Sequence, residues 1–347
     1  MCFFAHPQRF WGWLTEREDQ TNRVKETIRR TAAPMRQRLF FAALLALMAS
    51  PAGTQLAGLA TAQQRGSLDP KPMPPLVNPA DPATPAKQLF GRVAEPAPPP
   101  TKSVGFYSRG CLAGASALPQ DGATWQVMRL SRNRNWGHTN LISFVERLAA
   151  KVPEVTGWRG ILVGDMSQPR GGPMLTGHAS HQIGLDADIW LTPMPERVLT
   201  RQEREDLSAT NMVRDDWLDV DAAQWTPAHA ALIKTAAEDA AVERVLVNPA
   251  IKRALCRSAT GDRGWLNKVR PNFGHNYHMH VRLACPKGNE TCREQDATPA
   301  GDGCDSSLEW WFSDEVLHPK PRPPKPPKPP LTLAQLPTEC RQVLFSK

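Results

Sequence analysis

Two short stretches of this 347-residue chain carry five of its nine histidines. Residues 177–190 read Gly-His-Ala-Ser-His-Gln-Ile-Gly-Leu-Asp-Ala-Asp-Ile-Trp, and residues 273–283 read Phe-Gly-His-Asn-Tyr-His-Met-His-Val-Arg-Leu. Polar and apolar side chains alternate over residues 185–189 and again over residues 278–283. This period of two is typical of a strand that buries one face in a core. We therefore expect two strands whose polar faces bring imidazoles and carboxylates together in one cleft.

The residue types in this cleft are those of a catalytic zinc site. Two imidazoles and a carboxylate are a common ligand set for catalytic zinc, which keeps a fourth position open for water. Water bound in this way is acidic enough to supply hydroxide near neutral pH, and a further neutral imidazole can act as general base. The alternative is a set of ordinary surface or core histidines beside a locally hydrogen-bonded Asp pair. Five histidines in two alternating segments fit that alternative poorly.

Segments outside the two stretches predict a mixed domain. Apolar spacing and good helix formers indicate helices at residues 140–148, 200–206 and 227–242. The strands that we expect lie at residues 161–163, 184–191, 244–247 and 279–283. The predicted fold class is α+β, with a small antiparallel core sheet that carries the zinc site, flanking helices, and loops tied by disulfides.

Several other hydrolase motifs are absent from the sequence. No His-Glu-x-x-His helix occurs, which excludes thermolysin-type and metzincin-type sites. No Gly-x-Ser-x-Gly or Ser-x-x-Lys motif indicates a serine nucleophile. The chain has seven cysteines, and no Cys-x-x-Cys pair suggests a zinc knuckle. Six of them follow residue 100, so an exported chain would form three disulfides, whose pairing the spacing alone leaves open.

The net charge of +8 is confined to two segments. Residues 1–62 contribute +4 and residues 319–330 contribute another +4, which leaves 30 basic and 30 acidic side chains in the rest of the chain. Binding to nucleic acid needs clustered Lys and Arg on the folded surface. A balanced body therefore argues against a nucleic-acid partner.

An apolar run of eleven residues at positions 39–49 follows Arg36 and Arg38. Spanning a bilayer takes about 20 apolar residues, so the run predicts a signal segment over residues 1–62 and no stable membrane anchor after its cleavage. Cleavage fits after Ala62, and earlier small residues also allow it. Because the run lies deep, we expect the true start at Met35; a long n-region with a real anchor is the alternative. Export predicts a periplasmic location.

Proline divides the chain. Of 34 prolines, eleven lie within residues 70–100 and eight within residues 319–330. Proline lacks a backbone donor and fixes φ, so both stretches predict extended spacers. The expected organisation is a linker at residues 63–103, one domain at residues 104–318 and a tail at residues 319–347.

The spacing His181-x6-Asp188 followed by His278-Met279-His280 resembles the signature of zinc peptidases that include lysostaphin-type and D-Ala-D-Ala enzymes. More narrowly, the stretches at residues 177–189 and 278–282 resemble the penicillin-insensitive murein endopeptidase family. The likeness extends over residues 105–312 and into the tail near Cys340.

This resemblance implies roles for individual residues. His181, Asp188 and His280 would bind zinc, and His178 would line the metal cleft. His278 would be the general base, and His275 would lie beside the oxyanion or orient the water.

A second metal contact would fall at Asp216 and Asp219, although the family's histidine is missing from this loop. Arg282 is a candidate for binding substrate carboxylates, with Arg270 and Lys268 as weaker ones that are equally well explained as solvated charges. The disulfides implied by the family pair Cys111 with Cys340, Cys256 with Cys304 and Cys285 with Cys292.

The activity implied by the resemblance is zinc-dependent hydrolysis of the D-alanyl to meso-diaminopimelyl cross-link of peptidoglycan. Such an enzyme has no serine for β-lactams to trap. Two alternatives remain. One is a zinc D-Ala carboxypeptidase or dipeptidase that acts on free stem peptides. The other is a cell-wall binding protein without catalysis, against which the presence of a base beside the ligands argues.

Overall fold

The computed structural model describes residues 65–321, 326 and 328–347. The signal segment expected at residues 1–62, with its alternative start at Met35, lies outside the described residues. Among the described residues, no helix is both long enough and apolar enough to span a membrane.

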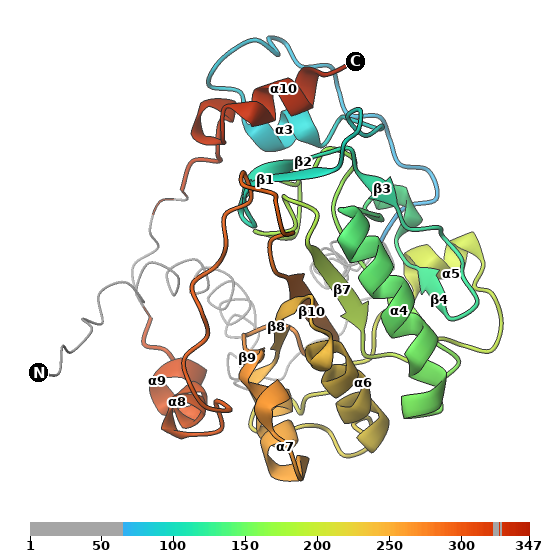
Figure 1. Cartoon of the computed structure of the whole chain (residues 1–347), viewed down its shortest axis with the longest axis vertical. Coiled ribbons are helices and arrows are strands. Elements are labelled where there is room, and N and C mark those ends of the chain that lie inside the picture. The colour runs from blue at the N-terminus through green and yellow to red at the C-terminus, as the bar shows by residue number, and fades with distance from the viewer. Residues whose placement is uncertain (1–64, 322–325, 327) are drawn as a thin grey trace, which may run out of the picture. The chain divides into compact units, whose positions relative to one another are not determined.

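A six-stranded mixed sheet forms the centre of the fold (Figure 1). Its strands, in spatial order, are β4 (Trp125–Val127), β6 (Ile161–Val163), β7 (Asp186–Trp190), β10 (His278–Leu283), β8 (Val242–Val247) and β9 (Val269–Pro271). The four inner strands pair antiparallel, as the sequence predicts, whereas both edge strands pair parallel to their neighbours. The antiparallel core is therefore correct, but the whole sheet is mixed.

The two faces of the central strands differ as the alternation predicts. Ala187, Ile189, Met279 and Val281 belong to the main apolar core. Helices α4 (Thr139–Thr156) and α6 (Pro227–Glu238) supply the other side of this core through buried leucine, isoleucine, valine, phenylalanine and alanine side chains. The opposite face of β7 and β10 carries the aspartates and histidines, so burial of one face fixes the direction of the other.

Two helices end at residues other than those expected. Helix α4 runs to Thr156, where Gly157 ends it in a left-handed conformation with φ 74°. Helix α6 ends at Glu238 rather than near residue 242, because residues from Val242 onward pair with β10 as strand β8. Helix α5 (Arg201–Asp206) matches the expectation and begins at a Thr200 capping box. Helix α7 (Pro249–Ser258) and strands β4 and β9 have no counterpart among the expected elements.

A second, smaller core is built from residues 86–113 and 336–344. It contains α3 (Ala86–Phe90), α10 (Glu339–Phe345) and the hairpin of β1 (Lys102–Phe106) and β2 (Arg109–Ala113). Phe90 is buried in this core, and Ala86 N–H donates to the Leu331 carbonyl over 2.7 Å. The linker expected at residues 63–103 therefore includes a folded helix. Proline flanks this helix but is absent from it, which is why proline count alone misses it.

Three disulfides pair the cysteines in the combinations that the resemblance implies. Cys111–Cys340 joins β2 to α10, Cys256–Cys304 joins α7 to the segment before α8 (Ser306–Glu309), and Cys285–Cys292 closes a short loop after β10. The first bridge spans 229 residues of sequence and the last only 7.

Replacing Cys111 and Cys340 together by alanine should lower stability more than replacing Cys285 and Cys292. Closing a longer loop restricts the unfolded chain more, and the difference between these loops corresponds to about 3 kcal/mol. Urea unfolding of both double variants, followed by far-UV circular dichroism, measures this difference. Equal midpoints for the two variants would contradict the loop-length argument.

Candidate metal centre

The pairing of β7 with β10 sets the site. Asp188 lies opposite His280, and Asp186 lies opposite Arg282. All four side chains are buried, on the face turned away from the main core. Two strands that are far apart in the sequence thus deliver carboxylates and imidazoles to one place, as the alternation predicts.

Two further histidines come from the loop before β7. The nitrogens of His178 and His181 lie 3.4 Å and 3.5 Å from Asp188 carboxylate oxygens. One ligand atom each from His178, His181 and Asp188 lies within 4.8 Å of the others, which makes this trio suited to hold a metal ion. Both ring nitrogens of His181 are buried and have no hydrogen-bond partner among the residues that the structure describes. Unpartnered buried nitrogens are costly unless a cation coordinates them.

His280 contacts the same carboxylate from the second strand. Its Nδ1 lies 3.1 Å from Asp188 Oδ1, and its Nε2 lies 3.2 Å from Asp186 Oδ1. Burial opposes a charge here, but the two aspartates raise the pKa of His280 to about 9. These two carboxylates therefore favour positive charge between them, which a divalent cation would supply. His181, Asp188 and His280, the three implied ligands, lie together, and His178 joins them more closely than the expected role of cleft lining.

A buried carboxylate behind His178 was not expected. Asp165 follows β6, and its Oδ2 accepts from His178 Nε2 over 2.9 Å. The same oxygen accepts from Arg132 over 2.9 Å and from Arg134 over 2.8 Å. Burial works against ionisation, but His178 and the two arginines hold the pKa of Asp165 below its usual range. Asp165 thus fixes the ring of His178 with Nδ1 turned toward Asp188.

Asp186 holds the other side of the site. Its Oδ2 accepts from the backbone N–H of His181 over 2.9 Å, and its Oδ1 faces His280. Arg282 donates to both oxygens of Asp186, over 2.7 Å and 3.1 Å. Although burial opposes it, this guanidinium helps to keep the pKa of Asp186 well below its usual range.

The geometry gives no support to the substrate-binding role expected for Arg282. Its remaining Nη1 donates to Gln295 over 2.8 Å, and its guanidinium lies 4.0 Å from the centroid of the Tyr107 ring. Only 7% of the residue is exposed. A group with every nitrogen engaged inside the protein is not available to a substrate carboxylate. Arg282 instead neutralises Asp186.

His275 and His278 lie next to the ligand set, with ring centroids 5.0 Å apart. His278 Nε2 lies 3.6 Å from Asp188 Oδ1, and its buried Nδ1 has no hydrogen-bond partner within the described part of the chain. Burial lowers the pKa of His278 to about 4, against the opposing charge of Asp188. Burial also holds the pKa of His275 well below its usual range. Both imidazoles are consequently neutral near pH 7, and His278 can accept a proton.

The expected second metal contact lacks support in the geometry. Asp216 pairs with Arg214 and accepts from Leu218 N–H, whereas Asp219 pairs with Arg257 over 2.7 Å. Neither belongs to a metal-holding group among the described residues. Lys268, the weaker substrate candidate, donates to the Asp239 carbonyl over 3.0 Å and is likewise engaged within the protein.

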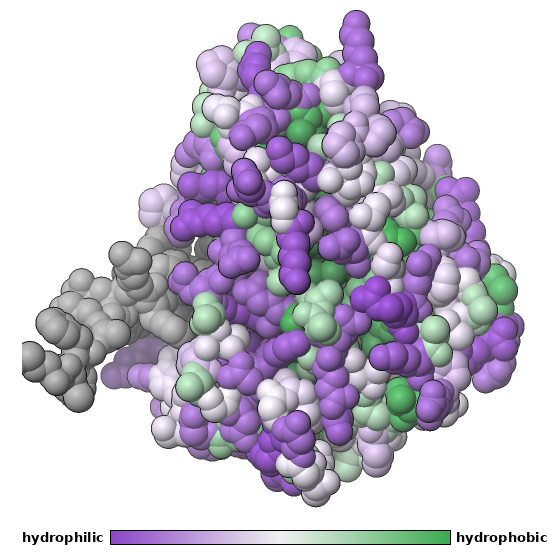
Figure 2. Space-filling model, in the orientation of Figure 1, coloured by the Kyte–Doolittle hydropathy of each residue, from purple (hydrophilic) through white to green (hydrophobic). Residues whose placement is uncertain are grey.

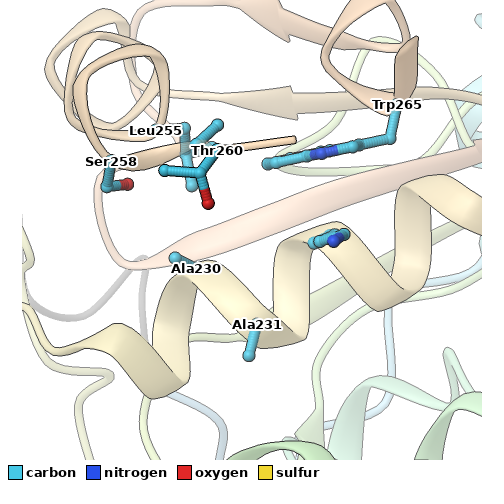
Figure 3. Close-up of a pocket in the computed structure, with 8 residues that line it drawn as sticks. Ala230, Ala231, Leu255, Ser258, Thr260 and Trp265 are labelled. Atoms are coloured by element: carbon cyan, nitrogen blue, oxygen red, sulfur yellow. The ribbon is translucent and has the colours of Figure 1, made fainter. Parts of the chain in front are cut away.

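A small cavity of about 170 Å³ lies apart from the histidines, between α6 and α7 (Figure 3). The cavity is lined by Lys234, by small residues and by Leu255 and Trp265. Figure 3 labels six of the lining residues. None of the site histidines or aspartates contributes to it. Hydrophilic side chains cover much of the molecular face in Figure 2, with apolar residues scattered among them.

Comparisons with known proteins agree with this geometry. The sequence model described as penicillin-insensitive murein endopeptidase matches residues 103–345. The penicillin-insensitive murein endopeptidase of Haemophilus influenzae is 45% identical over 243 residues, which cover 70% of this chain and 82% of that protein. The proteins of that name from Pectobacterium atrosepticum and Escherichia coli (strain 55989 / EAEC) are each 42% identical, over 75% and 76% of this chain and 89% and 94% of their own lengths. The chain is therefore an enzyme, and it belongs to the penicillin-insensitive murein endopeptidase family.

Proposed function

We propose that this protein is a zinc-dependent D,D-endopeptidase that hydrolyses the D-alanyl to meso-diaminopimelyl cross-link of peptidoglycan in the periplasm. The observation that supports it most is the convergence of His181, Asp188 and His280, with both nitrogens of His181 buried and unpartnered. Imidazole nitrogens and one carboxylate are a donor set that suits zinc. Cross-linked peptidoglycan is the partner, because the relatives are named murein endopeptidases.

In this proposal His178, His181, Asp188 and His280 hold the ion. Zinc, when bound, acidifies water and polarises the amide carbonyl. His278 is neutral and lies beside Asp188. It accepts a proton from the attacking water and later returns that proton to the leaving amine. His275, whose Nδ1 donates to the Phe273 carbonyl over 3.0 Å, keeps an unprotonated Nε2 that can accept a hydrogen bond and so orient the water; in this tautomer it cannot donate to the oxyanion.

Replacing His278 by alanine should lower kcat by roughly 10²–10⁴-fold while zinc stays bound, because the variant loses the base and keeps the ligands. Digestion of purified cross-linked sacculi, with mass spectrometry of the products and metal analysis of the protein, measures both effects. A variant that keeps both its zinc and its activity would show that another group is the base.

The same digestion separates the endopeptidase from its alternatives. Uncross-linked monomers from the wild-type protein support cleavage of the cross-link, whereas release of D-Ala alone indicates a carboxypeptidase. A protein that binds sacculi and releases nothing would be a binding module.

A chelator should abolish hydrolysis, and added zinc should restore it, because the proposed reaction requires the zinc ion that the four ligands hold.

Penicillin at concentrations that saturate serine enzymes should leave the rate unchanged, because no serine adduct forms. Rates measured on sacculi with each additive test both statements. Full activity after exhaustive dialysis against a chelator would contradict the zinc proposal.

Replacing Asp186 by asparagine should weaken zinc binding about 10–100-fold. The amide cannot balance Arg282, and it holds the His181 backbone and the His280 ring less firmly. Competition with a chromophoric chelator measures the affinity without any activity assay. Asp216→Asn, which changes an exposed aspartate outside the site, is the matched control, and equal affinities in the two variants would sink the argument.

A further inference from the structure

Three aromatic side chains from three separate segments converge beside the histidines, and the mechanism uses none of them. Trp217 lies in the loop after Val213, Phe273 precedes β10, and Trp311 lies in η4 (Trp310–Phe312). Ring centroids are 6.5 Å apart between Trp217 and Phe273 and 5.4 Å apart between Phe273 and Trp311. We call these three residues the aromatic row.

The loop that carries Trp217 is held firmly. Arg253 of α7 donates to the Leu218 carbonyl over 3.2 Å, and Arg257 of the same helix pairs with Asp219 over 2.7 Å. Trp217 itself has a left-handed backbone with φ 62° and is 39% exposed. A bulky residue in this conformation costs free energy, and such residues concentrate at functional sites. His181 and His275 of the site share the conformation.

Arg253 also fixes the other end of the row. Its guanidinium lies 3.2 Å from the centroid of the Phe312 ring, next to Trp311, and its Nη2 donates to Glu309 over 2.6 Å. One side chain of α7 therefore positions both the Trp217 loop and η4. The row is a pre-formed surface built on a helix, which lowers the entropic cost of binding a ligand.

The middle member connects the row to the chemistry. The Phe273 carbonyl accepts from His275 Nδ1 over 3.0 Å, with Gly274 between them at φ 72°. The His275 ring in turn lies 5.0 Å from that of His278. A ligand on the row thus lies close to the site where the amide is cut.

The charges around the row favour a neutral ligand. Arg214, Arg253 and Arg257 each pair with a carboxylate: Asp216, Glu309 and Asp219, respectively. An anionic stem peptide would find no uncompensated cation in these three pairs. A sugar ring, in contrast, presents a flat apolar C–H face to an aromatic ring and hydroxyls to water.

We propose that the aromatic row binds the glycan strand of murein, by stacking neutral N-acetylated amino sugars on Trp217, Phe273 and Trp311. The inference rests on the proposed function, because the glycan is covalently attached to the peptides that the site would cut. It adds a subsite that holds the strand while a cross-link enters the cleft.

The test compares two soluble substrates: a cross-linked muropeptide dimer that bears its disaccharides, and the same peptide dimer stripped of sugar by an amidase. Trp217→Ala should lower kcat/KM on the disaccharide-bearing dimer by about three- to tenfold relative to the stripped dimer, through KM. Trp217→Phe should restore part of this preference. Leu218→Ala is the matched control, because Leu218 is also 39% exposed in the same loop but carries no ring.

A direct binding measurement keeps the proposal independent of catalysis. Amidase-treated glycan strands, free of peptide and with the lactyl carboxylates that the amidase exposes converted to neutral methyl amides, should quench wild-type tryptophan fluorescence and bind Trp217→Ala several-fold more weakly. Equal losses on both dimers would assign the row to the stem peptide and overturn the proposal, as would unchanged strand binding by a folded Trp217→Ala. If the wild type cuts neither dimer, the proposed function fails, and strand binding still decides on the row.

Discussion

The register between β7 and β10 is the constraint on which the site depends. It sets Asp188 against His280 and Asp186 against Arg282, in a sheet whose other face is sealed by α4 and α6. A slip of one residue would turn each of these side chains into the apolar core. The main core therefore affects the geometry of the site without contributing side chains to it. Packing of Ala187, Ile189 and Met279 holds the strands, and with them the residues of the polar face, in alignment.

The site also shows how buried charge is tolerated. Asp165 is balanced by Arg132 and Arg134, and Asp186 is balanced by Arg282. Burying such pairs costs solvation free energy that apolar residues would not. In exchange, the carboxylates orient the imidazole rings, because each of them also faces a ring nitrogen of a proposed ligand, His178 or His280. The arginines thus support the candidate metal centre indirectly, through the carboxylates that they neutralise.

The sequence predicts the strands whose polar and apolar residues alternate, and it misses side chains whose partners lie far away along the chain. Period-two alternation locates β7, β10 and their polar face, because each residue reports on its neighbours. Asp165 is a single aspartate after a three-residue strand, and its arginine partners lie about 30 positions away, so no local pattern marks it. Alternation places Arg282 on the correct face of the sheet, but it does not show how deeply the side chain is buried. Only the fold shows that Tyr107 and Gln295 enclose it. Likewise, proline count describes the linker without revealing the helix that packs on α10.

Asp186 links the two kinds of ligand that the site contains. Asp188 and His280 are fixed by strand pairing, whereas His178 and His181 lie on a loop, and the left-handed backbone of His181 (φ 70°) is not held by any ladder. Asp186 accepts from that backbone through one oxygen and faces His280 through the other. Asp186, itself held by Arg282, is therefore one of two carboxylates that connect the loop to the sheet, and Asp165, which binds His178, is the other. A site that must keep imidazoles within tenths of an ångström can use a loop only if such a connection transfers the rigidity of the sheet to it.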